Sequence, residues 1–163
     1  PHVFGDVNVR DSGEVIQNWE DIKMKEGHRS VLAGVPVSLP AMIKSHRIQD
    51  KVRAVGFDWD EREQVWDKVH EEIDEVRQEL RNGKDPSRVE DEFGDLLFSI
   101  VNAARLHDVE PETALERTNR KFISRFKYLE SKALEQGRTL KEMSLEEMER
   151  QMQRRGMEAG TRE

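Results

Sequence analysis

Apolar residues recur at helical spacing along much of the chain, and two neighbouring segments carry the clearest pattern. Plotted at about 100° per residue, the apolar positions of each segment fall on one arc of a helical wheel. The first arc holds Val65, Trp66, Val69, Ile73, Val76 and Leu80, and the second holds Phe93, Leu96, Leu97, Ile100, Val101 and Ala104. The pattern predicts two consecutive amphipathic helices, each with one face for packing.

Residues that start and stop helices stand at the ends of this pair. Asp60 and Glu63 have the spacing of a capping box for a first helix to about residue 81. Asn82-Gly83 is expected to end that helix. Asp85-Pro86 supplies a cap and a first-turn proline for a second helix, which we expect to reach about residue 107.

Four further segments are expected to be helical, and they span residues 14–26, 39–55, 111–137 and 145–155. Ser144 and Glu147 cap the last of these, and the tail beyond Gly156 is expected to fray. No segment alternates polar and apolar residues convincingly, as a half-buried strand does. We therefore predict an all-α fold of the four-helix-bundle type with short flanking helices.

The chain divides into three expected parts. Residues 1–38 read as a leader or interdomain linker with one short helix, 39–137 as the main helical domain, and 138–163 as a C-terminal helix and tail. The sequence begins with Pro1 rather than Met, from which we expect a piece of a longer or processed polypeptide.

Composition narrows the class of protein. Charged residues make up 37% of the chain, apolar residues 35% and aromatic residues 6%, which is typical of amphipathic helices that associate as oligomers. A net charge of −7 argues against a nucleic-acid partner. The absence of cysteine excludes disulfides, thiolate catalysis and Cys-ligated metal sites. Without an apolar run of about 18 residues or a signal peptide, we expect a cytoplasmic protein that does not enter a membrane.

Two acidic pairs of equal spacing stand on the two predicted helices. Glu72 and Glu75 lie three residues apart on the first helix, and Glu92 and Asp95 lie three apart on the second. Residues at this spacing share a helical face, and both pairs border an apolar arc. Two carboxylates about 5 Å apart repel by roughly 3 kcal/mol at an effective dielectric constant of about 20. Four that converged would take up protons or bind a cation, and oxygen ligands favour Mg²⁺, Mn²⁺ or Ca²⁺ over zinc.

A plainer interpretation stands beside this one. Acidic residues amid Lys and Arg on a helix usually form a solvated face, and the residues alone leave both interpretations open. Trp59 and Trp66 are expected to be core residues rather than platforms for a base. The five histidines show no metal-binding pattern, and the paired Glu-x-x-His of a di-iron bundle is missing.

Four motifs in order resemble one known family. They are VGFDW, KVHEEIDEV, EDEFGDLLFSIVNAAR and PETALERTNRKFISRF. Across roughly residues 39–130 they closely resemble the MazG nucleoside triphosphate pyrophosphohydrolases. The leader PHVFGD resembles the segment that closes the N-terminal half of two-domain MazG proteins. The resemblance implies a C-terminal MazG-type catalytic domain, preceded in the full-length chain by a missing N-terminal MazG-like domain.

The resemblance also implies a reaction and its residues. The family hydrolyses nucleoside triphosphates to nucleoside monophosphate and pyrophosphate with Mg²⁺, for which Mn²⁺ is an expected substitute. The implied metal ligands and catalytic residues are Glu72, Glu75, Glu92 and Asp95, with Glu72 or Glu75 as the base. The implied nucleotide contacts are Arg88, Asn119, Lys121 and Arg125. Met152 stands where a relative has a tryptophan that helps to bind nucleotide, and a homodimer is expected to complete the site.

Two alternatives accompany this reading. One is an all-α pyrophosphohydrolase of narrower specificity, acting on dUTP or phosphoribosyl-ATP. The other is a non-catalytic helical interaction module whose acidic pairs are merely solvated.

Overall fold

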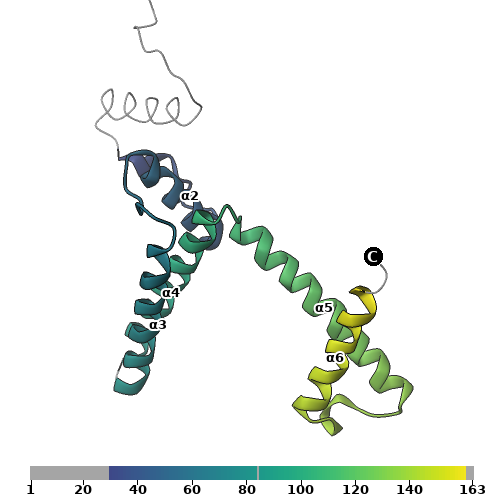
Figure 1. Ribbon diagram of the computed structural model, residues 1–163. Helices are drawn as coiled ribbons and strands as arrows, with labels where there is room; N and C mark the ends of the chain where they lie inside the picture. The colour runs from purple at the N-terminus through teal and green to yellow at the C-terminus, as the bar shows by residue number, and fades with distance from the viewer. Residues whose placement is uncertain (1–29, 84, 161–163) are drawn as a thin grey trace, which may run out of the picture. The chain divides into compact units, whose positions relative to one another are not determined.

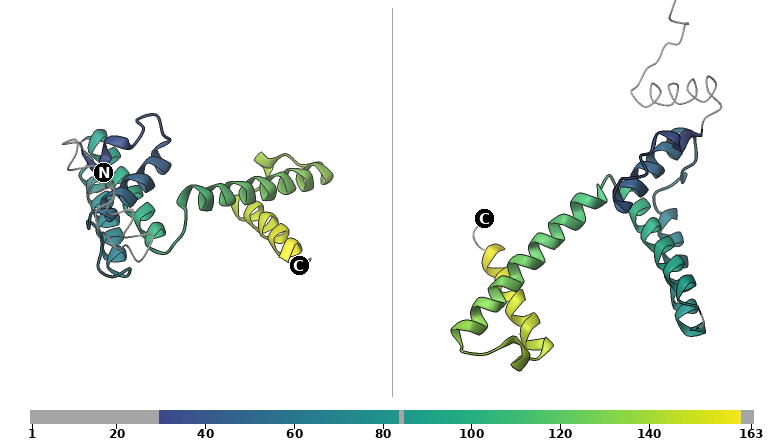
Figure 2. Two further views of the ribbon diagram at one scale, coloured as in Figure 1. Left: turned by 90° about the horizontal axis from the view of Figure 1, so that it is seen from above. Right: turned by 180° about the vertical axis from the view of Figure 1, so that it is seen from behind.

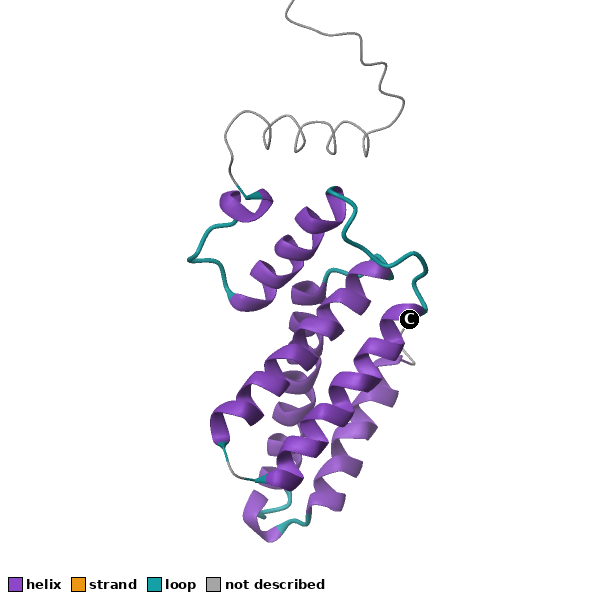
Figure 3. Cartoon of the chain, turned by 90° about the vertical axis from the view of Figure 1, so that its left-hand side faces the viewer, coloured by secondary structure: helices purple, strands orange, loops and turns teal. Residues whose placement is uncertain are grey.

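The computed structural model describes residues 30–83 and 85–160, and every regular element in these ranges is a helix (Figure 3). The elements are η1 (Val31–Gly34), α2 (Ala41–Ala54), α3 (Gln64–Asn82), α4 (Pro86–Leu106), α5 (Pro111–Glu135), η2 (Leu140–Glu142) and α6 (Leu145–Gly160). The all-α prediction is confirmed. The helix expected at 14–26 lies outside the described residues.

Most helix ends follow the local sequence signals. Gly83 ends α3 with φ at 58°, a left-handed conformation that glycine adopts without steric cost. Asp85 caps α4, because its Oδ1 accepts a hydrogen bond from the backbone N–H of Ser87 at 3.0 Å. Pro86 occupies the first turn, as expected. These signals place a sharp reversal between α3 and α4.

The capping box expected at Asp60 and Glu63 is wrong. The backbone N–H groups of Gln64, Val65 and Trp66 donate to carbonyls three residues earlier. Because the chain makes these tight turns first, α3 begins only at Gln64 and has no side-chain cap. Asp60 lies too far before the first helical turn to cap it.

The chain forms two compact units, residues 1–112 and 113–163, and each is described by itself. In the first unit, α3 and α4 lie side by side, as both Figure 1 and Figure 2 show, and α2 packs against α4. Val65 and Val69 of α3 meet Ala103 of α4 in a buried cluster, and Ile73 and Leu96 pack around it. The short Gly83–Asp85 connection makes α3 and α4 antiparallel neighbours.

The predicted apolar arcs are buried only in part. In α4, Phe93, Leu97 and Ile100 are 45%, 55% and 46% exposed. Trp59 and Trp66 are 40% and 42% exposed, so the expectation that both belong to the core is wrong. The apolar pattern predicted helices correctly, but the packing within this unit uses one part of each arc and leaves the other accessible.

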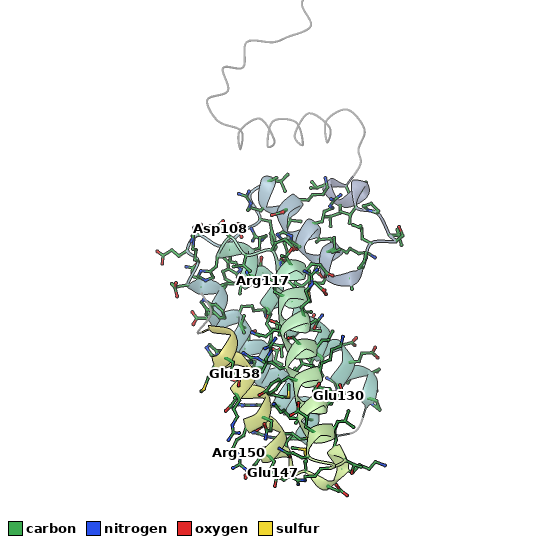
Figure 4. The ribbon with its side chains drawn as sticks, turned by 90° about the vertical axis from the view of Figure 1, so that its right-hand side faces the viewer. Asp108, Arg117, Glu130, Glu147, Arg150 and Glu158 are labelled. Carbon is green, nitrogen blue, oxygen red and sulfur yellow. The ribbon has the colours of Figure 1, made fainter. Side chains whose placement is uncertain are left out.

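The second unit is built from α5, η2 and α6. Leu129 and Ala133 of α5 form a buried cluster with Met143, against which Met148 and Met152 of α6 pack. Figure 4 shows α6 with the labelled side chains of three of its charged residues, Glu147, Arg150 and Glu158.

The start of α6 agrees with the sequence, whereas its end does not. The Ser144 hydroxyl accepts the N–H of Glu147 at 3.2 Å, which confirms the expected cap. The helix continues to Gly160, beyond the expected end near Gly156. A single glycine weakens a helix by about 1 kcal/mol relative to alanine without breaking it, and Met157 and Glu158 after it are good helix formers. Within the described segments, no helix combines the length and the hydropathy needed to cross a membrane.

Candidate metal and nucleotide site

Three carboxylates meet where α3 and α4 lie side by side. One carboxylate oxygen from each of Glu72, Glu92 and Asp95 lies within 4.8 Å of the other two. Glu72 is buried, Glu92 is half-buried and Asp95 is exposed, so the cluster has one open side. The antiparallel packing of two amphipathic helices thus brings together acidic groups twenty or more residues apart in the sequence.

The cluster contains two polar atoms without a partner. Oε2 of Glu72 and Oε2 of Glu92 are buried, and neither accepts a hydrogen bond from any described residue. Buried polar atoms nearly always have a partner, so each such atom needs an explanation. A cation seated among the three carboxylates would supply one.

Lys68 neutralises one side of the cluster. Its Nζ lies 2.6 Å from Oε1 of Glu72 and 3.2 Å from Oε1 of Glu71. The hydrogen bond with Glu72 raises the pKa of the Lys68 ammonium well above its ordinary value, so Lys68 is positively charged at neutral pH. One lysine therefore offsets part of the negative charge while leaving the Oε2 atoms unsatisfied.

Glu75 lies beside the three carboxylates without joining them. Its side chain is half-buried. Partial burial, the negative charge of Glu72, a side-chain hydrogen bond with Glu72 and the charge of Glu92, in this order, raise the pKa of Glu75. Glu75 therefore stands at the margin of the cluster, in contact with Glu72.

The donor set suits a hard cation. All three ligand groups are carboxylates, and oxygen donors fit Mg²⁺, Mn²⁺ or Ca²⁺ better than zinc, which favours nitrogen and sulfur. Mg²⁺ commonly takes only a few protein carboxylates and completes its coordination with water and phosphate oxygens. The open side at Asp95 leaves room for such a ligand.

A cavity of about 760 Å³ adjoins this cluster, with Glu72 and Asp95 in its lining. Its aromatic lining comes from Phe57, Trp59 and Phe98, which belong to α4 and to the segment that joins α2 to α3. Ligand sites typically have volumes of about 300–1,000 Å³ and combine apolar walls with a few polar groups. The cavity is large enough for a nucleoside.

An ion pair between Asp58 and Arg105 lies in the polar part of the cavity lining. Nη2 of Arg105 lies 2.6 Å from Oδ1 of Asp58, and the Arg105 side chain is 7% exposed. Arg105 also donates through Nε and Nη2 to Oδ1 of Asn102, at 3.1 and 2.8 Å. Asp58 precedes Trp59 in the cavity wall, so this network fixes the wall to α4.

The remaining candidate residues lie elsewhere. Arg88 pairs with Glu79 of α3 at 3.2 Å and is 65% exposed. Asn119, Lys121 and Arg125 lie on α5 in the second unit, so their part in the site stays a prediction.

Three features of the site were missed from the sequence, although two left a signal there. Gln49 lines the cavity and is 3% exposed. It stands seven residues after Met42, in the middle of the apolar stripe of α2, where a polar residue is conspicuous. Lys68 precedes Glu72 by four residues, the spacing of an ion pair along a helix. The Asp58–Arg105 pair joins residues that are remote in the sequence, and no local sequence pattern predicts it.

Comparison with known proteins agrees with this geometry. Residues 61–129 match the model of the MazG nucleotide pyrophosphohydrolase domain. Nucleoside triphosphate pyrophosphohydrolase/pyrophosphatase MazG of Thermotoga maritima is 41% identical over 152 residues, covering 91% of this chain and 56% of that protein. Nucleoside triphosphate pyrophosphohydrolase of Escherichia coli K12 is 42% identical over 154 residues, covering 91% and 59%. Uncharacterized protein YabN of Bacillus subtilis is 46% identical over 153 residues, covering 92% and 31%.

The chain therefore spans little more than half the length of the first two relatives. The matched domain nevertheless includes all three residues of the carboxylate cluster, and Lys121 and Arg125 of α5. With an all-helical structure and three converging carboxylates beside a nucleoside-sized cavity, residues 61–129 of the chain form a domain of the MazG family.

Proposed function

We propose that this chain is the catalytic part of a Mg²⁺-dependent nucleoside triphosphate pyrophosphohydrolase. Its substrates are NTPs and dNTPs, and its products are a nucleoside monophosphate and pyrophosphate. The observation that carries the proposal is the pair of buried, unpartnered carboxylate oxygens on Glu72 and Glu92, in a cluster that borders a cavity. A merely solvated acidic face would not bury such oxygens.

Glu72, Glu92 and Asp95 would hold the magnesium ion, which Mn²⁺ could replace. Bound there, the ion would neutralise phosphate charge and make a nearby water molecule more acidic. Lys68 orients the Glu72 carboxylate through its 2.6 Å contact. The exposed carboxylate of Asp95 leaves one side of the cluster open for the triphosphate.

Glu75 is the proposed general base. It borders the cluster without being one of its three members, so its carboxylate remains available for a proton. The oxygen of a water molecule bonds to the α-phosphorus, the bond from that phosphorus to the bridging oxygen breaks, and pyrophosphate leaves with the electron pair. The proton released by the water passes to Glu75.

Basic and polar residues complete the proposed nucleotide site. Lys121 and Arg125 stand four residues apart on α5 and would offset the charge of the triphosphate, with Asn119 beside them. Arg88 belongs to the same proposed set. It must exchange its contact with Glu79 for a phosphate oxygen, and the 65% exposure of its own side chain leaves it free to turn away.

A second copy of the chain is the proposed partner. The α4 residues Phe93, Leu97 and Ile100 form an accessible apolar row, and Leu80 of α3 is 55% exposed. Apolar side chains gathered in this way typically mark an interface. Light scattering of the purified chain should show a dimer, and Leu97→Glu should shift it towards monomer.

Pyrophosphate release across the eight common NTPs and dNTPs, with magnesium in excess, tests the activity. Glu72→Gln and Asp95→Asn should each lower kcat by at least about 10²-fold, because each removes charge from the ion's proposed ligands. Glu75→Gln should lower kcat to a similar degree while leaving the affinity for magnesium nearly unchanged. Glu90→Gln, the same kind of change at an exposed position of α4, is the matched control.

Three results would count against the proposal. Full activity in Glu72→Gln or Asp95→Asn, with helicity intact by circular dichroism, would remove those residues from the site. Turnover confined to dUTP or phosphoribosyl-ATP would assign the narrower specificity. A calorimetric titration without stoichiometric magnesium binding, together with no turnover of any triphosphate, would favour a non-catalytic helical module.

A further inference from the structure

Gln49 carries a buried acceptor atom that the proposed chemistry does not use. The side chain lies on α2, is 3% exposed and lines the cavity beside the carboxylate cluster. Its Nε2 donates to the carbonyl oxygen of Phe98 at 2.9 Å. A carbonyl oxygen can only accept, so this contact fixes which end of the amide is nitrogen.

The other end of the same amide is unsatisfied. Oε1 of Gln49 is buried and accepts no hydrogen bond from any described residue. Glutamine oxygens in protein interiors nearly always have a donor. With the amide held by Phe98, Oε1 remains available to accept a hydrogen bond from a molecule bound in the cavity.

The walls of the cavity show what kind of molecule that is. Phe57, Trp59 and Phe98 present aromatic surface and are 78%, 40% and 43% exposed. Aromatic side chains at such accessibility suit a flat, unsaturated ring, because stacking on them is tolerant of the identity of the base. Asn102 adds a donor, since its Oδ1 is engaged by Arg105 and its amide nitrogen is the group left to donate.

The geometry points to the cavity as the nucleobase subsite, in which Gln49 Oε1 accepts a hydrogen bond from an N–H group on the pairing edge of the base. This inference rests on the proposed function, because it takes the triphosphate to lie at the carboxylate cluster. Enzymes that bind an isolated base commonly combine stacking with hydrogen bonds to that edge. Here Gln49 supplies the hydrogen bond and Phe57, Trp59 and Phe98 supply the stacking surface.

Because Gln49 Oε1 is a single hydrogen-bond acceptor, it selects bases by one feature, an N–H group on the pairing edge. Adenine and cytosine carry an amino group on the pairing edge, and guanine, uracil and thymine carry a ring N–H there. Every common base therefore satisfies Gln49, whereas a base without an N–H on that edge leaves the buried oxygen unpaired. The subsite accepts all five bases and rejects analogues that lack the donor, since unpaired buried groups are the strongest source of discrimination.

The test compares two substrates that differ by one donor. ATP and purine riboside triphosphate differ only in the 6-amino group. Pyrophosphate release by the 163-residue chain should show kcat/KM at least about 10-fold higher for ATP. In Gln49→Met, which keeps the length of the side chain and removes the acceptor, the two substrates should become nearly equal. Gln78→Met, an exposed change on α3, should keep the wild-type ratio.

The ratio of kcat/KM for ATP to that for purine riboside triphosphate distinguishes recognition of the base by Gln49 from a purely structural role of this residue. If Gln49 only tied α2 to α4 through Phe98, Gln49→Met would lower activity on both substrates alike and preserve their ratio, which would overturn the inference. Equal use of the two substrates by the wild-type chain would overturn it as well. The wild-type comparison of CTP with 2-pyrimidinone riboside triphosphate, which lacks the 4-amino group, needs no variant and should also show a preference of at least about 10-fold.

Failure of the proposed function can be told apart from failure of the proposed base subsite. A chain that cleaves no triphosphate would end that proposal alone, and tryptophan fluorescence would then compare the binding of ATP and purine riboside triphosphate directly. Tighter binding of ATP that disappears in Gln49→Met would still support the subsite, and equal binding of the two would overturn it.

Discussion

Nζ of Lys68 lies 2.6 Å from Oε1 of Glu72, while Oε2 of the same carboxylate is buried without a partner in the described part of the chain. One carboxylate thus faces a built-in cation on one side and an unsatisfied position on the other. Two further acidic groups, Glu92 and Asp95, surround that position. The arrangement leaves uncompensated negative charge inside the protein, and it therefore links stability to the binding of a cation.

Glu92→Gln should stabilise the metal-free protein and abolish its response to magnesium. The change removes one of several clustered carboxylates, whose mutual repulsion after screening is worth roughly 1 kcal/mol. A metal at 100 times its dissociation constant adds about 2.7 kcal/mol to the wild type and nothing to a variant that does not bind it. Urea unfolding in EDTA and in excess magnesium measures both effects.

The matched substitution Glu90→Gln, at an exposed position two residues away on α4, should leave the magnesium response intact. A wild-type protein whose unfolding midpoint is the same in EDTA and in magnesium would contradict the linkage.

Lys68→Met should have the opposite effect on the metal-free protein. The change leaves the buried carboxylate of Glu72 without its cation, and the loss should be about 1 kcal/mol because Lys68 is partly solvated. Magnesium should recover much of that loss, since a divalent ion offsets the same charge. The free energy of unfolding, measured with and without magnesium, should therefore depend on the ion more steeply in Lys68→Met than in the wild type. Equal dependence in the two proteins would show that Lys68 and the ion act on different charges.

Local signals in the sequence predicted much of the fold. Helix periodicity and the signals at Gly83 and Asp85 correctly predicted the two consecutive helices α3 and α4 and the break between them, because each depends only on neighbours in the chain. Equal spacing of the acidic pairs at the margin of two apolar arcs led to the hypothesis that they converge. In the structure, Glu72, Glu92 and Asp95 meet and Glu75 borders them.

Contacts between distant segments could not be read in the same way. A helical wheel gives the direction of a side chain from its own axis, and it does not say which element packs there. The bond from Gln49 to the Phe98 carbonyl and the Asp58–Arg105 pair each join residues more than forty positions apart. Trp59 was expected in the core because the residues around it in the sequence do not show that it lines a cavity.

Asp58→Asn should weaken the fold at neutral pH, and the difference should vanish in acid. Burial alone would raise the pKa of Asp58, but the hydrogen bonds from Arg105 and from the N–H of Trp59 together outweigh it and hold the pKa below 3.8. A lowered pKa contributes stability at pH values above 3.8, and this contribution is lost as the pH falls through the folded-state pKa.

Hydrogen bonds to charged groups of this kind are worth about 1.5–3 kcal/mol, which is the loss expected in Asp58→Asn at pH 7. Urea unfolding from pH 7 down to pH 2.5 measures the two stability curves, which should converge as the pH falls through the lowered pKa of Asp58. Curves that stay parallel over this range would show that the carboxylate charge contributes nothing. Asp60→Asn, in the same connecting segment and exposed, is the matched control and should follow the wild type.

Gly156→Ala should preserve stability and weaken substrate binding, because the guanidinium of Arg125 lies against Gly156. A Cβ atom at position 156 would stand 2.6 Å from Nη2 and 3.1 Å from Cζ of Arg125. The guanidinium ends a flexible side chain, so it moves aside while α6 keeps its place, and alanine in a helix is favoured over glycine by up to about 1 kcal/mol. If Arg125 binds phosphate as proposed, KM for ATP should rise severalfold while the free energy of unfolding stays equal or increases. In an Arg125→Ala background the same glycine substitution should change KM no further, since there is no guanidinium left to displace. An equal rise in KM in both backgrounds would mean that Gly156 acts on the substrate by another route.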